Sequence, residues 1–520
     1  MMPDLPVLPT SSNPPHHIAC DLLVVGGGIN GAGIARDAAG RGLSVVLCEK
    51  DDLAAHTSSA STKLIHGGLR YLEHYEWGLV RKALAEREVL LRAAPHILWP
   101  LRFVMPHDKA QRPAWLIRAG LFLYDHLAKR ELLPGSSGID LRRHAAGLPL
   151  KKTFVRGFVY SDGWVDDARL VVLNAIDAAQ RGATILTRTA CTAVDPQPDH
   201  WKALLTSADG TVTTVRARCL VNAAGPWASL FLDAAAKRTS GTSVRLVKGS
   251  HIVVKKLFDH SDAYLFQHPD GRIIFAIPYE GHFTLIGTTD IDYRGSTDRV
   301  AIDDDEITYL CALSNHYFEK TITPADVVWS YSGVRPLLQD ESSDAASVTR
   351  DYRLEFNTEG APMLSVFGGK ITTFRKLAEE AVDLVARSLD NVAGAWTSTA
   401  CLPGGDLFGP APSNRSVLEC AQFTQGLQTR YAWLPASLVA RYARAYGTRT
   451  HMLLAGRSAI VDMGKEIAPA LFAAEVTYLM LHEWARTADD ILWRRSKLGL
   501  HLPKTTAAIL AHWMAANATD

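Results

Sequence analysis

We predict an α/β protein of three parts from this sequence: a domain with a doubly wound parallel sheet, a domain with an antiparallel sheet, and a helical domain at the C-terminal end. Three observations support this prediction. A glycine-rich turn separates a strand-like segment from a helix-like segment within residues 20–50, as in a βαβ unit. Residues 243–295 are dense in β-branched and aromatic residues. Beyond residue 400, Ala, Arg and Leu recur at helical spacing.

The remaining elements follow from the residue pattern in chain order. Small and hydroxyl-bearing residues at 54–66 suit a segment that lies along a ligand. We expect helices at 77–91, 114–130, 167–181, 303–320 and 370–389, and further strands at 183–194, 201–207 and 211–221. The expected domains are a nucleotide-binding domain at 20–88, 153–235 and 336–398, an antiparallel-sheet substrate (cap) domain at 89–152 and 236–335, and a helical domain at 399–520.

Residues 1–19 are predicted to be a disordered leader. They contain five prolines and lack the basic start and apolar stretch of a signal peptide. The whole chain has 55 Lys and Arg against 54 Asp and Glu, so its net charge of +1 argues against a nucleic-acid binder. Its seven cysteines are scattered and never spaced as C-x-x-C, which predicts neither a disulfide framework nor a zinc site and favours a reducing compartment.

The glycine-rich turn has the pattern G-x-G-x-x-G at Gly26, Gly28 and Gly31, directly after an apolar strand and at the start of a helix. Gly26 permits the tight turn, Gly28 lets the backbone approach a pyrophosphate, and Gly31 lets the helix pack on the strand. Glu49 follows the second strand, where a carboxylate can accept hydrogen bonds from ribose hydroxyls. Together these features predict a Rossmann-like domain with a bound dinucleotide.

The motif alone does not distinguish a nicotinamide from a flavin, since both present an ADP half to it. Two later segments favour the flavin. One is the strand end VNAAGPWA at 221–228, and the other is SVFGGKITTFRK at 365–376, where a glycine pair opens a long helix. A helix that begins at 369–372 would place a positive dipole beside the part of a flavin ring that becomes anionic on reduction.

Residues 62–152 hold sixteen Lys and Arg against eight Asp and Glu, a net charge of +8. Within them, residues 114–130 form an amphipathic pattern with Arg118, Asp125 and Lys129 on one stripe and a wide apolar surface beside it. Such a helix belongs either to a core or to an interface with anionic lipid. The sequence leaves both open, and no stretch is long and apolar enough for a membrane-spanning helix.

Several long strings resemble the FAD-dependent, respiratory glycerol-3-phosphate dehydrogenases, and the similarity runs from about Asp21 through the helical C-terminal region. The strings are GGGINGAGIARDAAGRGLSV, TSSASTKLIHGGLRYLEH, GSHIVV, IGTTD, YSGVRPL, SVFGGKITTFRKLAE and TADDILWRRSKLGL. The leader before Cys20 departs from the family pattern. The resemblance implies a non-covalently bound FAD, oxidation of sn-glycerol 3-phosphate to dihydroxyacetone phosphate by hydride transfer, and electron transfer to a membrane quinone.

The resemblance also implies the residues of the site. Arg70, Tyr71, Arg335 and Lys370 match the family positions that bind substrate, and Arg335 and Lys370 are expected to act in catalysis as well. The hydroxyl proton needs a base with a pKa near neutrality, for which His251 is preferred and His66 is the alternative. The cofactor contacts implied are Gly26, Gly28, Asn30, Gly31, Glu49, Thr57, Ser58, Ser59, Ser61, His66, Gly67, Gly68, Leu69, Ala224, Gly225, Trp227, Gly368, Gly369, Lys370 and Thr372; no metal is expected.

The resemblance further suggests a homodimer. The basic, aromatic segment 99–130 and the net charge of +8 favour peripheral binding of this segment to anionic lipid at the inner, cytoplasmic face of the cell membrane. Three alternatives stay open: a glycerol-3-phosphate oxidase that uses oxygen, an amine or 2-hydroxy-acid oxidase of the same flavin superfamily, and a flavin-containing sensor or adaptor without enzymatic activity. A phosphate-bearing substrate would need several cations, whereas a carboxylate substrate would need one arginine.

Overall fold

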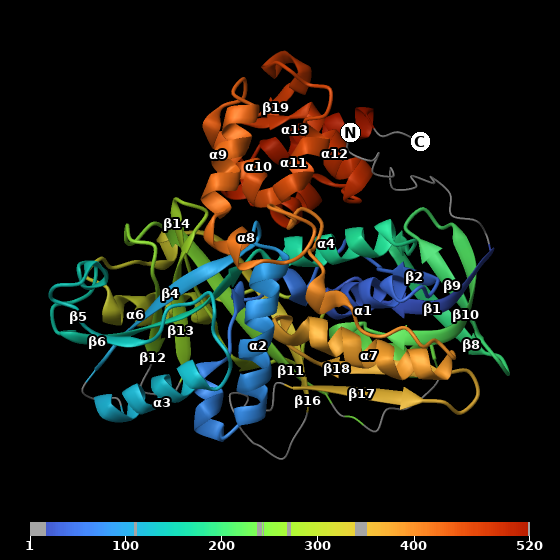
Figure 1. The fold of residues 1–520 in the computed structure, drawn as a ribbon, viewed down its shortest axis with the longest axis horizontal. Coiled ribbons are helices and arrows are strands. Elements are labelled where there is room, and N and C mark those ends of the chain that lie inside the picture. Colours follow the sequence, from blue (N-terminus) through green and yellow to red (C-terminus); the bar gives the residue numbers. More distant parts are fainter. Residues whose placement is uncertain are drawn as a thin grey trace.

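The computed structural model describes residues 17–108, 112–236, 242, 244–267, 272–338 and 351–517. A mainly parallel sheet, a mainly antiparallel sheet and a C-terminal group of helices make up this part of the chain, which confirms the predicted fold class (Figure 1). Of the predicted leader, residues 1–16 lie outside the described residues. Residues 17–19 instead begin the first strand, because they pair in register with a neighbouring strand.

The first sheet contains the predicted βαβ unit. Its parallel strands lie in the order β18, β10, β1, β2 and β7, with β17 antiparallel at the β18 edge and β9 and β8 continuing antiparallel from β10. The strands are β1 (His17–Val25), β2 (Val45–Cys48), β7 (Thr184–Leu186), β8 (Thr189–Pro196), β9 (Trp201–Ser207), β10 (Val212–Asn222), β17 (Tyr352–Asn357) and β18 (Met363–Gly368).

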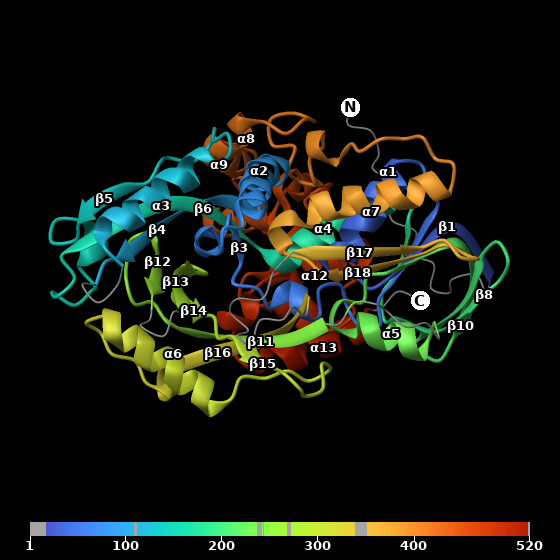
Figure 2. The ribbon, with the colours of Figure 1, turned by 90° about the horizontal axis from the view of Figure 1, so that it is seen from below.

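Apolar residues cover both faces of this sheet. Within β1, Leu22 and Val24 join one core, while Leu23 and Val25 join another, because successive strand residues point to opposite faces. The first core includes α1 (Ile29–Gly40), α4 (Asp167–Gln180) and α7 (Phe374–Ser388), and the second includes α5 (Ala228–Ala234). Figure 2 shows α1 and α7 on the opposite side of β17 and β18 from α5. This is the expected doubly wound arrangement.

The second sheet has the order β15, β11, β14, β13, β12, β4, β6 and β3, with β16 paired to β11 and β5 to β6; only the β12–β4 pair is parallel. Its strands are β3 (Leu64–Ile65), β4 (Leu98–Pro106), β5 (Ser137–Asp140), β6 (Arg156–Val165), β11 (Val244–Lys255), β12 (Ala263–Gln267), β13 (Ile273–Tyr279), β14 (Phe283–Gly287), β15 (Ile291–Asp292) and β16 (Val327–Leu338). Helix α6 (Asp304–Tyr317) packs on one face, and α2 (Trp77–Ala93) and α3 (Ala114–His126) pack on the other.

The domain boundary expected at residue 153 differs from the structure. Strand β6 was assigned to the nucleotide-binding domain, but it pairs with β4 along nine residues and therefore belongs to the second sheet. The chain returns to the first domain at α4, whose N-terminus is capped by Asp166. Local residue pattern predicts that a segment is a strand, whereas the sheet it joins depends on a partner about sixty residues away.

The proposed lipid-facing segment at 99–130 is too long. Strand β4 lies between β12 and β6 in the second sheet, and its residues are buried or half-buried. Only α3 presents an exposed apolar face, since Trp115 is 72% and Phe122 53% exposed. Among its residues only Leu121 and Tyr124 are buried. The core-helix interpretation of 114–130 is therefore wrong for most of the helix.

The C-terminal domain has its own apolar core (Figure 1). Its elements are α8 (Asn414–Leu418), α9 (Cys420–Arg430), α10 (Ala436–Tyr446), α11 (Thr450–Leu453), β19 (Glu466–Ala468), β20 (Leu471–Phe472), α12 (Ala473–His482), a π-helix at Asp490–Arg495 and α13 (Thr506–Ala516). Buried ion pairs join it to the first domain, Arg495 to Asp52 at 2.5 Å and Arg169 to Glu483. Within the described residues, no helix has the length and apolar character needed to cross a bilayer.

Candidate active site

A cavity of about 580 Å³ lies between the two sheets, a size typical of ligand sites. It extends from the glycine-rich turn after β1 to strands β11 and β16 of the second sheet. Most of the residues expected to contact cofactor or substrate line it: Gly26, Gly28, Asn30, Glu49, Thr57, Ser58, Ser61, His66, Gly68, Leu69, Tyr71, Ala224, Gly225, Trp227, His251, Arg335, Gly368, Gly369, Lys370 and Thr372.

The turn after β1 requires glycine for steric reasons. Gly26 has a φ of +114°, and a Cβ there would lie 2.5 Å from the carbonyl oxygen of Ala223. A Cβ on Gly31 would collide with the carbonyl oxygen of Gly26, so Gly31 supports the turn from outside the cavity. Gly28 caps α1, whose N-terminus faces the cavity. Backbone N–H groups and a helix N-terminus at such a turn form a site for an anionic pyrophosphate.

Glu49 follows β2 and points back to the turn. Its Oε2 accepts a hydrogen bond from the Gly27 N–H at 2.7 Å, and its Oε1 accepts from the Asp51 N–H at 2.9 Å. Burial raises the pKa of the Glu49 carboxyl. Each carboxylate oxygen has a second lone pair, so the group can still accept from ribose hydroxyls.

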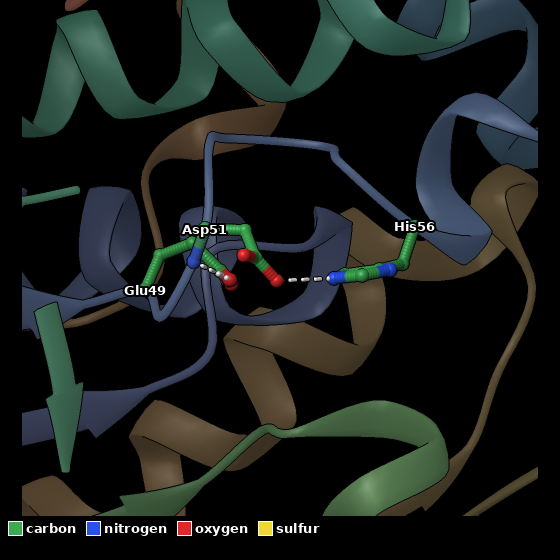
Figure 3. A group of neighbouring side chains, drawn as sticks. All are labelled: Glu49, Asp51 and His56. Atoms are coloured by element: carbon green, nitrogen blue, oxygen red, sulfur yellow. Dashed lines mark hydrogen bonds and ion pairs between the residues drawn. The ribbon is translucent and has the colours of Figure 1, made fainter. Parts of the chain in front are cut away.

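Glu49, Asp51 and His56 form a compact group beside the turn, with ligand-type atoms within 4.8 Å of one another (Figure 3). The His56 Nε2 lies 2.7 Å from Asp51 Oδ2, and this hydrogen bond lowers the pKa of Asp51 to about 2. His56 also contacts the ring of Trp227, and Lys50 Nζ lies 4.4 Å from that ring. Hydrogen bonds already engage these oxygens, so we interpret the group as support for the nucleotide-binding turn.

The segment of small and hydroxyl-bearing residues lies along the cavity as expected, but its side chains differ in direction. Ser58 Oγ accepts from the Ile29 N–H at 3.0 Å, and Thr57 donates to the carbonyl of Val334 at 2.7 Å. Ser61 donates to Asp167. Ser59 lines a neighbouring crevice instead of this cavity, and its hydroxyl donates to the carbonyl of His56.

The second glycine pair brings a distant helix to the same cavity. Gly368 and Gly369 have φ values of +73° and +100°, and the carbonyl of Gly368 accepts from Asn30 of α1 at 3.3 Å. A 3₁₀ turn at Ile371–Thr373 then leads into α7. The N-terminal end of this helical segment lines the cavity, which places its positive dipole end where the sequence predicted it.

Strands β11 and β16 present His251 and Arg335 to the cavity. The register pairs His251 with Tyr331 and Val247 with Arg335, so these residues project from one face of the sheet although they are 84 positions apart in sequence. The rings of His251 and Tyr331 stack at 4.7 Å. The pairing of β11 with β16 thus places the candidate base, His251, and the candidate cation, Arg335, on the same face of the sheet.

His251 is 2% exposed, and its Nε2 lies 3.0 Å from the hydroxyl oxygen of Thr62. Its Nδ1 makes no hydrogen bond within the described part of the chain. Burial, together with the charges of Lys63 and Arg335, holds the pKa of His251 well below its ordinary value. The imidazole is therefore neutral near pH 7, and its pKa lies below the near-neutral value expected of the base from the sequence. If Nε2 donates to Thr62, then Nδ1 carries the lone pair that can accept a proton.

Two cations, Arg335 and Lys370, line the same cavity as this histidine. Arg335 Nη2 forms an ion pair with Asp290 Oδ1 at 2.8 Å and donates to the carbonyl of Thr289 at 3.0 Å. Lys370 Nζ lies 3.6 Å from the centroid of the Tyr71 ring. Arg70 belongs to the 3₁₀ segment Leu69–His74, but its side chain lies outside the described part of the structure.

Sequence reasoning missed several residues of this site. Asp290 follows β14 within the string IGTTD and was not assigned a role. Lys63 is 1% exposed and pairs with Asp167 at 2.7 Å, beneath the stacked rings of Tyr331 and His251. Asp167 was expected only as the first residue of the helix at 167–181. Nothing in the local sequence distinguishes a buried lysine from an exposed one, since only its distant partner permits burial.

Comparisons with known proteins agree with this geometry. A family model described as FAD dependent oxidoreductase matches residues 21–375, and one described as the C-terminal domain of alpha-glycerophosphate oxidase matches residues 395–518. A structure of glycerol-3-phosphate dehydrogenase from Bacillus halodurans, complexed with FAD, is 28% identical with a TM-score of 0.77 and covers 96% of this chain and 90% of its own. FAD is thus the cofactor, which confirms the flavin prediction.

Two curated relatives match nearly the whole chain. The glycerol-3-phosphate dehydrogenase of Pseudomonas aeruginosa is 53% identical over 496 residues, which covers 95% of this chain and 94% of that protein. The D-erythritol 1-phosphate dehydrogenase of Brucella abortus is 51% identical over 496 residues, which covers 95% of this chain and 97% of that protein. Both relatives are named for the oxidation of a phosphorylated polyol.

Proposed function

The chain belongs to the FAD-dependent glycerol-3-phosphate dehydrogenases, and from this premise we propose that it oxidises sn-glycerol 3-phosphate at C2 to dihydroxyacetone phosphate. Bound FAD supplies the two-electron acceptor for the hydride that leaves C2. One observation carries the proposal: Arg335, Lys370 and a neutral His251 line the same cavity as the glycine-rich turn after β1.

Arg335 and Lys370 suit the recognition of a phosphate. A guanidinium can bind a phosphate with two parallel hydrogen bonds, whereas an ammonium acts as a point charge that tolerates several geometries. Asp290 holds Arg335 by an ion pair, and Tyr71 lies against Lys370, so both cations are oriented before a ligand arrives. Fixed cations lose little conformational freedom on binding. Arg70, in the same segment as Tyr71, is proposed as a further substrate contact.

His251 is proposed as the general base. Loss of hydride from C2 leaves a carbonyl only if the hydroxyl proton also departs, and an uncharged imidazole can take it. The contact with Thr62 engages Nε2, so we assign this role to Nδ1, a buried atom that makes no hydrogen bond within the described residues. The nearby charge of Arg335 favours an alkoxide that develops at the C2 oxygen. His66 also lines the cavity, through a ring that meets Phe275 edge-on, and stays the alternative base.

The Brucella abortus relative raises a second candidate substrate, D-erythritol 1-phosphate. It shares the phosphate and the secondary alcohol but has one more carbon than glycerol 3-phosphate. The phosphate-binding cations proposed above serve either substrate, so selectivity would depend on the walls around the carbon chain. An amine or 2-hydroxy-acid substrate would present one carboxylate in place of a phosphate dianion, and the presence of two cations, Arg335 and Lys370, in the cavity wall favours the phosphate.

A membrane quinone is proposed as the second electron acceptor, with oxygen as the alternative. Support comes from α3, whose exposed apolar side chains include Trp115 and Phe122, and from the net charge of +8 over residues 62–152. An exposed apolar face within a basic segment fits peripheral binding to anionic lipid at the cytoplasmic face of the membrane. A homodimer is also part of the proposal, on family membership alone.

Substrate and acceptor can be tested on the purified protein. Reduction of bound flavin should occur with glycerol 3-phosphate and not with glycerol, glycine or lactate, since only the first carries phosphate. A preference for D-erythritol 1-phosphate would revise the substrate but retain the chemistry. Reduction of a quinone analogue without formation of hydrogen peroxide supports the quinone acceptor, whereas stoichiometric peroxide would assign the protein as an oxidase.

A further inference from the structure

Tyr124, a buried side chain of α3, contacts the chain segment that lines the active-site cavity. Whereas Trp115 and Phe122 face outward, Tyr124 is 3% exposed. Its hydroxyl oxygen lies 2.8 Å from the backbone nitrogen of Gly67, which donates a hydrogen bond to it. Gly67 precedes the 3₁₀ segment Leu69–His74, against which α3 packs. A helix on the outside of the second domain therefore contacts the segment that carries Arg70 and Tyr71 (Figure 1).

A buried network fixes the direction of the Tyr124 hydroxyl. The group donates to the carboxylate of Asp162 on β6, with oxygen distances of 2.8 and 2.9 Å. Arg87 of α2 binds the same carboxylate at 2.6 Å and balances its charge. Because the hydroxyl proton points to Asp162, a lone pair remains to accept from the Gly67 N–H. All three side chains are buried, which limits the access of bulk solvent to these groups.

The Gly67 peptide in turn sets the position of the cavity wall. Its neighbours His66 and Gly68 line the cavity, and the backbone of His66 meets the Thr372 hydroxyl at 3.3 Å. Gly68 has a φ of +77°, and the Tyr71 ring lies directly over the place that a Cβ would occupy. The same ring packs against Lys370 Nζ. Moving the Gly67 peptide would therefore move Tyr71 and with it the ammonium group.

We propose that Tyr124 is a positioning residue for substrate binding: its hydroxyl, held by Asp162, anchors the Gly67 peptide and so fixes the Tyr71–Lys370 pair in the cavity. This inference rests on the proposed function. It assigns to α3 a second role besides its exposed apolar face. Neither Tyr124 nor Asp162 lines the cavity, so the hydroxyl acts through the Gly67 peptide and not by direct contact with a ligand.

The test is Tyr124→Phe in the holoenzyme, with Tyr264→Phe as the matched control. Tyr264 is equally buried in the second domain and donates to the carbonyl of Ala146 at 2.6 Å, but it does not line the cavity. Tyr124→Phe removes the nearer acceptor of the Gly67 N–H and leaves the longer hydrogen bond to Asp162 Oδ1, which is 3.4 Å in the wild-type structure. We expect KM for glycerol 3-phosphate to rise about threefold to tenfold, the size of one lost hydrogen bond, with kcat within twofold.

Flavin content and thermal stability identify a merely structural effect. Tyr124→Phe should retain the flavin content of Tyr264→Phe, and Tyr264→Phe should keep the wild-type KM. An unchanged KM in Tyr124→Phe, or an equal rise in both variants, overturns the inference. If Tyr124→Phe does not fold, hydrogen exchange on the wild-type holoenzyme decides: the Gly67 amide should exchange as slowly as core strand amides, and fast exchange contradicts the anchor.

The inference and the proposed function fail in different ways. If glycerol 3-phosphate does not bleach the wild-type flavin, the proposed substrate is wrong, whereas slow exchange at Gly67 would still support the anchor. If the wild-type flavin bleaches but the KM of Tyr124→Phe matches the wild-type value, the function stands and the anchor is refuted.

Discussion

Truncation of Arg335 tests the phosphate site, and the structure allows its effect to be divided into two parts. Arg335→Ala removes a guanidinium that we expect to bind the substrate phosphate. A hydrogen bond between charged groups is worth about 1.5–3 kcal/mol. At about 1.4 kcal/mol per tenfold, this first part predicts a loss of about 10- to 100-fold in kcat/KM.

The second part comes from Asp290. Arg335 Nη2 pairs with its carboxylate at 2.8 Å, and the Asp290 side chain is 12% exposed. Without the arginine, that carboxylate faces the incoming phosphate with the same sign of charge, which we expect to cost about 1–2 kcal/mol more. Arg335→Ala should therefore lose on the order of 10²- to 10³-fold, and the double variant Arg335→Ala with Asp290→Asn should recover about tenfold.

The assay is steady-state oxidation of glycerol 3-phosphate with an artificial electron acceptor, with flavin absorbance as the control for cofactor binding. Arg335→Ala, Asp290→Asn and the double variant, measured with the wild type, form a double-mutant cycle. A kcat/KM of Arg335→Ala within threefold of wild type would refute the role of Arg335. A double variant no better than Arg335→Ala would refute the part assigned to Asp290.

Four further predictions concern other parts of the structure. His251→Asn should lower kcat by about 10²- to 10⁴-fold while His66→Asn changes it less than tenfold; the reverse order would move the base to His66. Gly28→Val should give folded protein without yellow colour, measured by absorbance and circular dichroism, since its side chain would fill the approach to the pyrophosphate; full flavin content would contradict this. Phe122→Ser should weaken flotation with anionic liposomes, and salt should weaken flotation of the wild type, whereas salt-independent flotation would point to apolar contact alone. Burial lowers the pKa of His96 to about 3, so the neutral folded form contributes its full stability above pH 6.5 and loses it as pH falls toward 3. In the wild type this histidine should reduce the free energy of unfolding by about 2 kcal/mol between pH 6.5 and 5. His96→Leu should remove that part of the pH dependence, and an unchanged slope would refute the prediction.

Local pattern predicted the elements of this protein well, because helices and strands are fixed by neighbours in sequence. The turn at Gly26, the start of α4 and the glycine pair before α7 could be located from residue type and spacing. Sheet membership could not be located in this way. Strand β6 has the composition of either sheet, and only its register with β4 places it in the second.

The same distinction between local pattern and distant partners applies to the residues of the site. His251 and Arg335 were found through family strings, but their shared face follows from the pairing of β11 with β16. Asp290, Lys63 and Thr62 were missed because each acts on a residue distant in sequence. The outward face of α3 was also undecided, since an apolar stripe fits a core as well as an interface until its neighbours are known.

The most direct test of the proposed chemistry is anaerobic titration of the purified, yellow holoenzyme with sn-glycerol 3-phosphate, monitored at the flavin absorbance maximum. Loss of the oxidised flavin band at stoichiometric substrate, with no change on addition of glycerol, is the result that Arg335, Lys370 and His251 predict. A flavin that stays oxidised with glycerol 3-phosphate at saturating concentration would contradict the account.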